Sequence, residues 1–327
     1  MQPKILVVRG GAIGDFLLTL PAVALLREAF PQARLEILGY EHIVSLAASG
    51  GYADRVRSIE YAAMAGFFNP KATLDPELSE YFGSFQQVVS YLYDPDGFFS
   101  GNLRRCGVKN LITASPKIDP EGEHASRQLA RPLESLALYL DGAGGPLLRP
   151  GEAETVFARD FFARAGAGDV EARPLVAIHP GSGGERKNWP ADRWGELGLG
   201  LLARPERPRL LLVGGEADAR TVAGLRTAWG ESWDDVLVAQ DLPLPALGAL
   251  LARCGRFLGH DSGISHLAAA VGTPCTLLFG PTDPDLWAPP YPAVEIIRAP
   301  GGLMENLTLA TVRGVVEATL FKGESHG

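Results

Sequence analysis

Short apolar runs that alternate with longer amphipathic segments are the feature that most constrains the fold of this chain. The alternation restarts after a glycine-rich segment at residues 141–151, DGAGGPLLRPG. Strands that alternate with helices predict parallel sheets with right-handed crossovers. We therefore predict an α/β protein with two Rossmann-like domains, residues 1–150 and 151–308. The C-terminal segment 309–327 is expected to form a helix that packs back on the N-terminal domain.

The loops that follow the predicted strands are the places to look for a site, because ligands of open α/β sheets bind beyond the carboxyl ends of the strands. The expected strands are residues 4–8, 35–38, 88–91, 111–113, 175–179, 209–213, 236–239, 256–258 and 275–279. The expected helices are residues 15–30, 126–140, 154–165, 191–202, 217–229, 244–254, 264–271 and 309–321. Unusual residues follow the strands that end at Val8, His179, Val213 and Leu258.

Charge and cysteine usage exclude several classes of protein. The 327 residues include 30 Lys and Arg against 38 Asp and Glu, a net charge of −8, which argues against a dedicated nucleic-acid binder. The three cysteines are widely spaced, which fits a reducing compartment without a disulfide framework. Arg9 and Asp15 interrupt the first apolar stretch, so we expect no signal peptide. The expected location is cytoplasmic, with attachment to a membrane surface left open.

The first of these loops is RGGAIGD, residues 9–15. A dinucleotide fingerprint needs GxGxxG, but Arg9 stands where the first glycine belongs. Asp15 in the first helical turn would repel a pyrophosphate, which argues against a nicotinamide dehydrogenase. The helix end stabilises this carboxylate as an ion that could act as a base, but this loop taken alone favours a simple helix cap for Asp15.

The second half carries two candidate anion-binding loops. HPGSGGERKNWP, residues 179–190, combines glycines and Ser182 with Arg186 and Lys187, although a solvated glycine loop would look the same. In GHDSGISH, residues 259–266, Asp261 and Ser262 lie at a predicted helix N-terminus, which is suited to phosphate. The two histidines of this loop match no metal-ligand spacing, and no GxSxG element of a serine hydrolase occurs.

The loop GGEADAR, residues 214–220, places acidic side chains after a strand. Carboxylates in this position accept ribose hydroxyl groups in dinucleotide-binding folds. Glu216 or Asp218 is therefore a candidate ribose contact, with capping of the helix 217–229 as the alternative.

Taken together, these loops resemble those of the glycosyltransferase family 9 heptosyltransferases. The resemblance rests on RGGAIGDFLLTLP, HPGSGGERKNWP, LLLVGGEAD and FLGHDSGISHLAAAVGTPCTLLFGPTDP, in this order, and it is strongest in the second half. It implies a GT-B fold, with the two domains facing each other across a cleft. It also implies inverting transfer of heptose from ADP-heptose to a lipopolysaccharide inner-core acceptor, with no cofactor and no required metal.

The resemblance also implies roles for single residues. Asp15 would be the general base on the acceptor hydroxyl, and Lys187 would face the donor phosphates. The other donor-binding candidates are Ser182, Glu216, Asp218, Asp261, Ser262, Gly263 and His266. The candidates for acceptor binding are Arg9, Gly14, Arg104, Arg105 and Arg127, although the last three could form a solvated basic face.

The expected partners are an ADP-sugar and a lipid-linked or core oligosaccharide, at the inner face of the bacterial inner membrane, and no nucleic acid. Residues 90–105 and 111–117 depart from the pattern of the family, and both lie in the acceptor half. Two alternatives remain open at this point: a family member with a different donor or a non-lipopolysaccharide acceptor, and a nucleotide-sugar-binding protein without catalysis.

Overall fold

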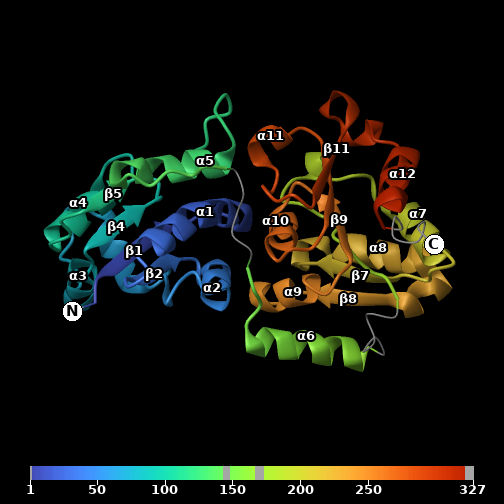
Figure 1. The fold of residues 1–327 in the computed structure, drawn as a ribbon, viewed down its shortest axis with the longest axis horizontal. Coiled ribbons are helices and arrows are strands. Elements are labelled where there is room, and N and C mark those ends of the chain that lie inside the picture. Colours follow the sequence, from blue (N-terminus) through green and yellow to red (C-terminus); the bar gives the residue numbers. More distant parts are fainter. Residues whose placement is uncertain (1, 143–147, 166–172, 321–327) are drawn as a thin grey trace. The chain divides into compact units, whose positions relative to one another are not determined.

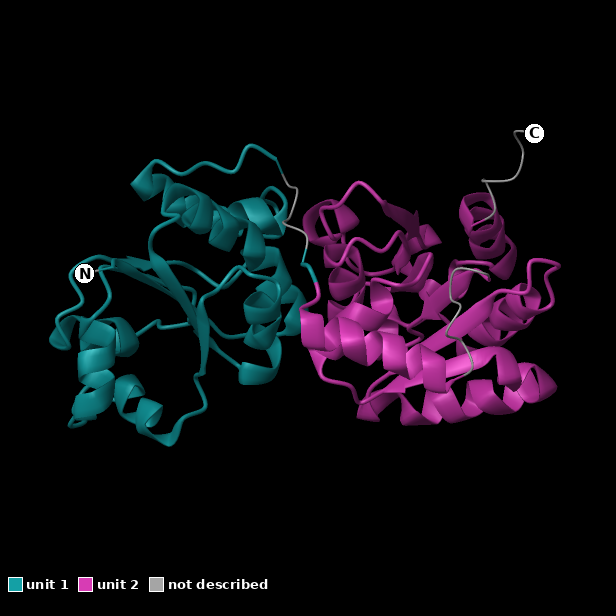
Figure 2. Cartoon of the chain, turned by 60° about the horizontal axis from the view of Figure 1, so that its bottom comes forward, with its two compact units in different colours: residues 1–149 teal, residues 150–327 magenta. Residues whose placement is uncertain are grey.

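The computed structural model describes residues 2–142, 148–165 and 173–320. The chain forms two compact units, Met1–Arg149 and Pro150–Gly327, which are coloured separately in Figure 2. Each unit contains one parallel sheet with helices on both faces, so the α/β class predicted from the sequence is confirmed. Residues 143–147 of the predicted linker lie outside the described residues.

The first unit is built on a five-stranded parallel sheet with the order β3-β2-β1-β4-β5. Its strands are β1 (Lys4–Arg9), β2 (Arg34–Gly39), β3 (Arg55–Ser58), β4 (Gln87–Ser90) and β5 (Leu111–Thr113). In the central strand, Val8 pairs with Leu38 on one side and with Ser90 on the other. The chain winds outward in both directions from β1, so the strand order reverses between β1 and β4.

Successive side chains of a strand point to opposite faces of the sheet, so the core of this unit is divided between two faces. Leu6 and Val8 point toward a cluster with Phe67, Phe82 and Phe99. These aromatic residues come from the 3₁₀ helix η1 (Ala62–Phe68), α3 (Pro76–Gly83) and α4 (Phe98–Arg105). The remaining helices are α1 (Ile13–Ala29), α2 (Glu41–Ser49) and α5 (Ala125–Ala130), and Figure 1 shows α5 beside α1.

The second unit repeats this plan with a six-stranded sheet in the order β11-β10-β9-β6-β7-β8. Its strands are β6 (Leu175–Ile178), β7 (Arg209–Gly214), β8 (Val236–Gln240), β9 (Arg256–His260), β10 (Cys275–Phe279) and β11 (Val294–Arg298). Its helices are α6 (Glu152–Arg164), α7 (Ala191–Leu202), α8 (Ala219–Trp229), α9 (Leu244–Leu251), α10 (Gly263–Ala270), α11 (Pro284–Trp287) and α12 (Leu309–Leu320). Here the strand order reverses between β6 and β9.

Three buried tryptophans dominate one face of the second sheet. Trp189, Trp194 and Trp229 pack with the apolar side chains of β6, β7 and β9. Val312 and Val316 of α12 belong to the same cluster, and α12 also packs on α7. The helix therefore completes the core of the second unit, which differs from the expectation that it packs back on the N-terminal domain. The apolar side chains Val312 and Val316 are buried, and they pack against the tryptophan cluster.

Several elements differ from those expected. The predicted helix 126–140 ends at Ala130, and the 3₁₀ helix η2 (Arg131–Leu136) follows, because Pro132 has no N–H to continue an α-helix. The edge strands β3 and β11 carry mixed, partly exposed residues, and the sequence patterns did not reveal them. No helix in the described part of the chain is long and apolar enough to span a bilayer.

Candidate functional site

In each unit the candidate residues gather where the strand order reverses, which is the usual ligand-binding edge of such sheets. In the first unit this edge is formed by the loops after β1 and β4. In the second unit it is formed by the loops after β6 and β9, and the loop after β7 lies next to them. The position follows from the topology alone, because parallel strands end at one edge.

Asp15 occupies the third position of α1. One carboxylate oxygen, Oδ2, accepts the N–H of Ala12 at 3.0 Å, while Oδ1 lies 3.9 Å from Nη2 of Arg9. The side chain is 38% exposed. Gly11 lies beside this carboxylate and has φ +101°, and a Cβ at this position would lie 3.0 Å from Asp15 Oδ2. Because Gly11 has no side chain, the Asp15 carboxylate is left uncovered on this side. Asp15 is thus a cap through one oxygen, and it leaves the other available to a ligand.

Arg9 is buried beneath this turn and is only 3% exposed. Its Nε donates to Thr19 Oγ1 at 3.0 Å, and its Nη2 donates to the carbonyl of Asp15 at 3.3 Å. Burial lowers the pKa of Arg9, and the Asp15 carboxylate opposes this shift. The structure therefore makes Arg9 an internal support for the first turn of α1 and does not present it to an acceptor, contrary to its expected role.

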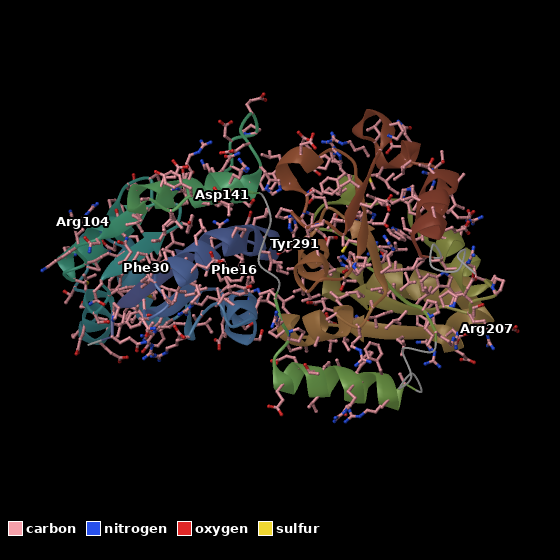
Figure 3. The ribbon with its side chains drawn as sticks, in the orientation of Figure 1. Phe16, Phe30, Arg104, Asp141, Arg207 and Tyr291 are labelled. Carbon is pink, nitrogen blue, oxygen red and sulfur yellow. The ribbon has the colours of Figure 1, made fainter. Side chains whose placement is uncertain are left out.

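The other basic candidates of the first unit do not gather with Asp15. Arg104 and Arg105 end α4, which runs back from the ligand-binding edge. In Figure 3, Arg104 lies toward the Phe30 end of α1, away from Phe16, the residue after Asp15. Arg105 donates to Asn102 Oδ1 at 2.7 Å. The structure therefore does not support these two arginines as acceptor ligands.

Arg127 and Gly14 complete the predicted acceptor set. Arg127 pairs with Glu123 at 3.5 Å and donates to the carbonyl of Asp141 at 3.3 Å. Its α5 packs against α1. Gly14 is half-buried beside Asp15 in the first turn of α1. Gly14 is thus the candidate that adjoins Asp15, whereas the guanidinium of Arg127 is already paired.

Lys187 lies at the centre of the second unit's site. Its Nζ is 2.6 Å from Asp261 Oδ2, and this ion pair joins the loop after β6 to the loop after β9. Thr282, in the loop after β10, donates its hydroxyl to the same oxygen at 2.8 Å. The Lys187 side chain is 33% exposed, while that of Asp261 is 10% exposed. The carboxylate is therefore a buried anchor that holds an accessible ammonium group at the edge of the sheet.

The N-terminus of α10 adjoins this ion pair. Ser262 is its N-cap, with Oγ accepting the N–H of Ser265 at 3.3 Å. Within the described residues, no acceptor contacts the N–H groups of Gly263 and Ile264. Unpaired N–H groups at the positive end of a helix dipole bind anions. The arrangement therefore suits a phosphate group.

Asp218 holds the loop after β7 against the loop after β6. Its Oδ2 accepts the N–H of Gly215 at 2.9 Å and lies 3.4 Å from Nε2 of His179. The hydrogen bond with His179 is the main cause that lowers the pKa of Asp218, and burial opposes it. Glu216, by contrast, is exposed. Glu216 is therefore the acid of this loop that is accessible for a ribose, whereas Asp218 is committed to its neighbours.

Gly181 is required for this contact. A Cβ on Gly181 would lie 1.8 Å from Asp218 Oδ1, so Gly181→Ala must displace the carboxylate. We expect this overpacking to lower the free energy of unfolding by about 1–3 kcal/mol and to weaken nucleotide binding. Urea unfolding and calorimetry measure the two effects.

Gly183→Ala is the matched control, because a Cβ at this position meets nothing within 4 Å. We expect its unfolding midpoint and nucleotide affinity to stay close to those of the wild type. Equal behaviour of the two alanine variants would contradict the importance of the Asp218 contact.

His260 is a buried structural group. Its Nε2 accepts the N–H of Trp189 at 2.8 Å, and its Nδ1 lies 3.3 Å from the carbonyl of Gly181. Both ring nitrogens are therefore engaged, and the ring is neutral with its proton on Nδ1. Burial lowers the pKa of His260 to about 3. The ring supports the loop that carries Lys187 and is not available as a metal ligand.

This lowered pKa predicts a loss of stability in mild acid. The unfolded chain binds a proton at His260 near its ordinary pKa of 6.5, while the folded chain stays neutral down to about 3. The stabilising contribution is therefore complete above pH 6.5 and falls by up to about 1.4 kcal/mol per pH unit below it. Urea unfolding between pH 5 and 7 should show a shallower pH dependence for His260→Gln. Parallel curves for the two proteins would contradict this assignment.

The remaining donor candidates, Ser182 and His266, lie inside the same framework. Ser182 Oγ contacts Asn188 Oδ1 at 2.6 Å and the carbonyl of Gly184 at 2.9 Å, which folds its glycine loop. His266 is 5% exposed in the first turn of α10. Among the described residues, no group of three or more His, Cys, Asp or Glu side chains could hold a metal ion.

The sequence patterns missed His179, His260 and Thr282 as members of the site. The two histidines stand at or directly after the carboxyl ends of β6 and β9, which are adjacent strands. Polar residues at the ends of neighbouring strands were a signal that could have found them. Thr282 is brought in by the next strand, β10, and only the strand order reveals its contact with Asp261.

Relatives of known function match this chain, some of them over most of its length and others over less than half. The family model of glycosyltransferase family 9 (heptosyltransferase) matches residues 146–309, about half of the chain. Lipopolysaccharide heptosyltransferase 3 of Escherichia coli is 24% identical over 293 residues, which are 84% of this chain and 83% of the relative. Lipopolysaccharide heptosyltransferase 2 of E. coli K12 is 29% identical over 161 residues, 47% and 43% of the two chains.

Solved structures share the whole fold. A glycosyl transferase family 9 protein from Veillonella parvula has a TM-score of 0.79 at 18% identity and covers 99% of both chains. The E. coli ADP-heptose heptosyltransferase II has a TM-score of 0.76 at 19% identity and covers 98% of this chain and 100% of its own. These likenesses and the two parallel-sheet units confirm the GT-B fold. With the family match over the segment that carries Lys187, Asp261 and Ser262, they show that the chain belongs to glycosyltransferase family 9, the heptosyltransferase family.

Proposed function

We propose that this glycosyltransferase transfers heptose from ADP-heptose to a lipopolysaccharide inner-core acceptor, with inversion at the anomeric carbon and without a metal ion. The observation that carries the proposal is the pairing of Lys187 with Asp261 beside the open N-terminus of α10, at the point where the sheet order reverses. One E. coli heptosyltransferase that shares this fold has been solved with ADP and with ADP-2-deoxy-2-fluoro heptose.

Asp15 is the proposed general base. It takes the proton of an acceptor hydroxyl, whose oxygen attacks the anomeric carbon from the face opposite the leaving diphosphate. The new C–O bond forms as the bond to ADP breaks, so the configuration inverts. The partly exposed side chain of Asp15 and the absence of a side chain at Gly11 support this role.

The departing ADP gains negative charge that must be stabilised. Lys187 and the N–H groups of Gly263 and Ile264 are the proposed donors to its phosphate oxygens, and Glu216 is the proposed contact to its ribose. In this proposal Asp15 of the first unit serves the acceptor, and Lys187 of the second unit serves the donor.

The nucleotide is tested by binding. ADP-sugars should raise the thermal unfolding midpoint more than UDP- or GDP-sugars at equal concentration, because a ligand that binds only the folded state stabilises it. A larger shift with a UDP-sugar would overturn the ADP assignment and favour a family member with another donor.

The reaction itself is tested with ADP-heptose and a purified core acceptor that lacks heptose. Mass spectrometry should show the addition of one heptose, NMR should show the inverted anomer, and EDTA should leave the rate unchanged. Binding of ADP-heptose without turnover on a broad acceptor panel would favour a nucleotide-sugar-binding protein.

A different acceptor is the second candidate function. The family match begins at residue 146, so it covers the donor half and leaves the acceptor half unmatched. Residues 90–105 and 111–117 contribute to that half around β4 and β5. Transfer to a non-lipopolysaccharide glycan, with the inner core left unmodified, would establish this alternative.

We also propose that the enzyme acts in the cytoplasm, at the inner face of the inner membrane, where a lipid-linked acceptor would be present. Cell fractionation tests this location. Recovery with the membranes at low salt and release at high salt would support peripheral attachment, and recovery in the soluble fraction at low salt would contradict it.

A further inference from the structure

A patch of exposed aromatic and basic side chains on the first unit takes no part in the proposed reaction. It consists of Phe68 at the end of η1, Lys71 in the loop that follows, and Phe98, Arg104 and Arg105 of α4. All five side chains are exposed. We propose that this aromatic-basic patch docks the enzyme on an anionic lipid bilayer. The inference rests on the proposed function only in that a lipid-linked acceptor would be present at such a surface.

The two segments that carry the patch are fastened to each other. The rings of Phe68 and Phe99 are stacked, with their centroids 5.2 Å apart. The side-chain amide of Asn102 donates to the carbonyls of Phe67 and Asn69 at 2.9 and 3.1 Å. The chain after η1 therefore runs along α4, and the two segments together form one surface.

Each of the two Phe-Phe pairs in these segments has one ring in the core and one at the surface. Phe67 and Phe99 are 0% and 1% exposed, whereas Phe68 and Phe98 are 45% and 38% exposed. Exposed apolar side chains that lie close together on a folded protein mark contact with a membrane or with another protein. Exposed phenylalanines flanked by cations are typical of membrane contacts, in which the rings enter the boundary between lipid headgroups and acyl chains.

The charges around these rings favour the membrane. Residues 61–74 and 97–110 contain no Asp or Glu, and they include the exposed cations Lys71, Arg104, Arg105 and Lys109. In the described part of the chain, none of these four cations forms an ion pair with a carboxylate. Their charges are therefore free to meet the phosphates of anionic lipids.

The net charge of the whole chain makes such a local surface necessary. The chain carries −8, so an anionic bilayer repels the protein on average. Attachment therefore requires that a cationic face be turned toward the lipid. Arg105 fits this requirement, because it donates to the neutral carbonyls of Pro70 and Ala72 at 3.5 and 3.4 Å and keeps its full charge.

The aromatic end of the patch lies at the ligand-binding edge of the first unit. Phe98 begins α4 in the connection that follows β4, and β4 pairs with β1, whose following loop leads to Asp15. η1 follows the neighbouring carboxyl end of β3. A bilayer that contacts Phe68 and Phe98 would therefore lie on the side of the unit where a lipid-linked acceptor must reach the proposed base.

Vesicle binding tests the aromatic part of the patch. At low salt the full-length protein should sediment with vesicles of phosphatidylglycerol and phosphatidylethanolamine. Phe68→Ser combined with Phe98→Ser should lower the partition coefficient about tenfold or more, because two rings no longer enter the lipid. Phe157→Ser combined with Leu303→Ser is the matched control, since these side chains of the second unit are 38% and 45% exposed. The control should keep wild-type binding, and equal losses would overturn the proposal.

Charge substitutions test the basic part of the patch without altering an aromatic contact. Lys71→Gln combined with Arg104→Gln should weaken binding to the anionic vesicles about 25-fold, at about fivefold for each cation. Arg55→Gln combined with Arg253→Gln removes the same charge from exposed positions outside the patch and should have a much smaller effect. Equal effects of the two pairs would show that net charge alone governs binding, which would overturn the proposed docking surface.

Further readouts separate docking from folding and from the reaction. Each variant should keep the wild-type thermal unfolding midpoint, ADP affinity and turnover of a lipid-free core oligosaccharide. A wild-type protein that does not sediment with the anionic vesicles would overturn the proposal. So would a dimer in analytical ultracentrifugation that Phe68→Ser with Phe98→Ser dissociates, because the patch would then bind a second copy of the chain. Vesicle binding without any heptose transfer would instead reject the proposed function and leave the docking surface in place.

Discussion

Asp15→Asn is expected to lower the transfer rate constant about 10²–10⁴-fold while leaving donor affinity unchanged. Asparagine keeps an oxygen that can accept the N–H of Ala12, so the first turn of α1 retains its cap. It cannot take a proton from an acceptor hydroxyl. Single-turnover kinetics with ADP-heptose and acceptor measure the loss, and calorimetry with ADP measures the donor affinity.

Asp75→Asn is the matched control, because Asp75 caps α3 by accepting the N–H of Leu78 at 2.9 Å and belongs to no proposed site. Its transfer rate should match that of the wild type. Full activity of Asp15→Asn would refute the assignment of the base. If Asp15→Asn lost thermal stability as well as activity, the result would instead indicate that Asp15 serves mainly as a helix cap.

Lys187→Ala is expected to raise the dissociation constant for ADP about 10–100-fold. Charge-assisted hydrogen bonds of this kind contribute about 1.5–3 kcal/mol, and each 1.4 kcal/mol is tenfold in affinity. The substitution removes the ammonium group and leaves the Asp261 carboxylate, held by Thr282, close to the phosphates. Calorimetric titration with ADP measures the change.

Arg186→Ala provides the control, since Arg186 is an exposed cation next to Lys187 with the same charge. It should change ADP affinity less than threefold, as expected for a solvated charge contributing up to about 0.6 kcal/mol. Lys187→Arg should restore part of the binding. Equal effects of the Arg186 and Lys187 variants would show that general attraction, not the anchored ammonium group, binds the nucleotide.

Much of the architecture could be predicted because a buried strand is recognisable from a few consecutive apolar residues. Residues 5–8 and 175–178 are continuous apolar runs, residues 275–279 are apolar apart from Thr276, and each segment forms an interior strand of its sheet. The glycine-rich loops after them marked the ligand-binding edge in both units. The edge strands β3 and β11 were missed because half-exposed strands carry mixed residues without a clear period.

The site was predicted less completely than the fold. Lys187, Asp261 and Ser262 stand in recognisable loops, and the structure brings them together. Arg9 has the charge expected of a ligand, but Thr19 and the Asp15 carbonyl bind it inside the unit. Exposure and pairing depend on neighbours that are distant in sequence, so charge alone could not separate Lys187 from Arg9.

Local sequence determined the alternating elements, the glycine loops and the residue types at the carboxyl ends of the strands, because hydrophobic period and turn chemistry act over a few residues. Strand order was decided only in three dimensions, and it made β6 and β9 neighbours. That adjacency pairs Lys187 with Asp261 across 74 positions of sequence and places His179 beside Ser262 across 83. The tertiary structure also decided where α12 packs, which is in the tryptophan cluster. An apolar helix face indicates that the helix must be buried, but it does not indicate against which partner.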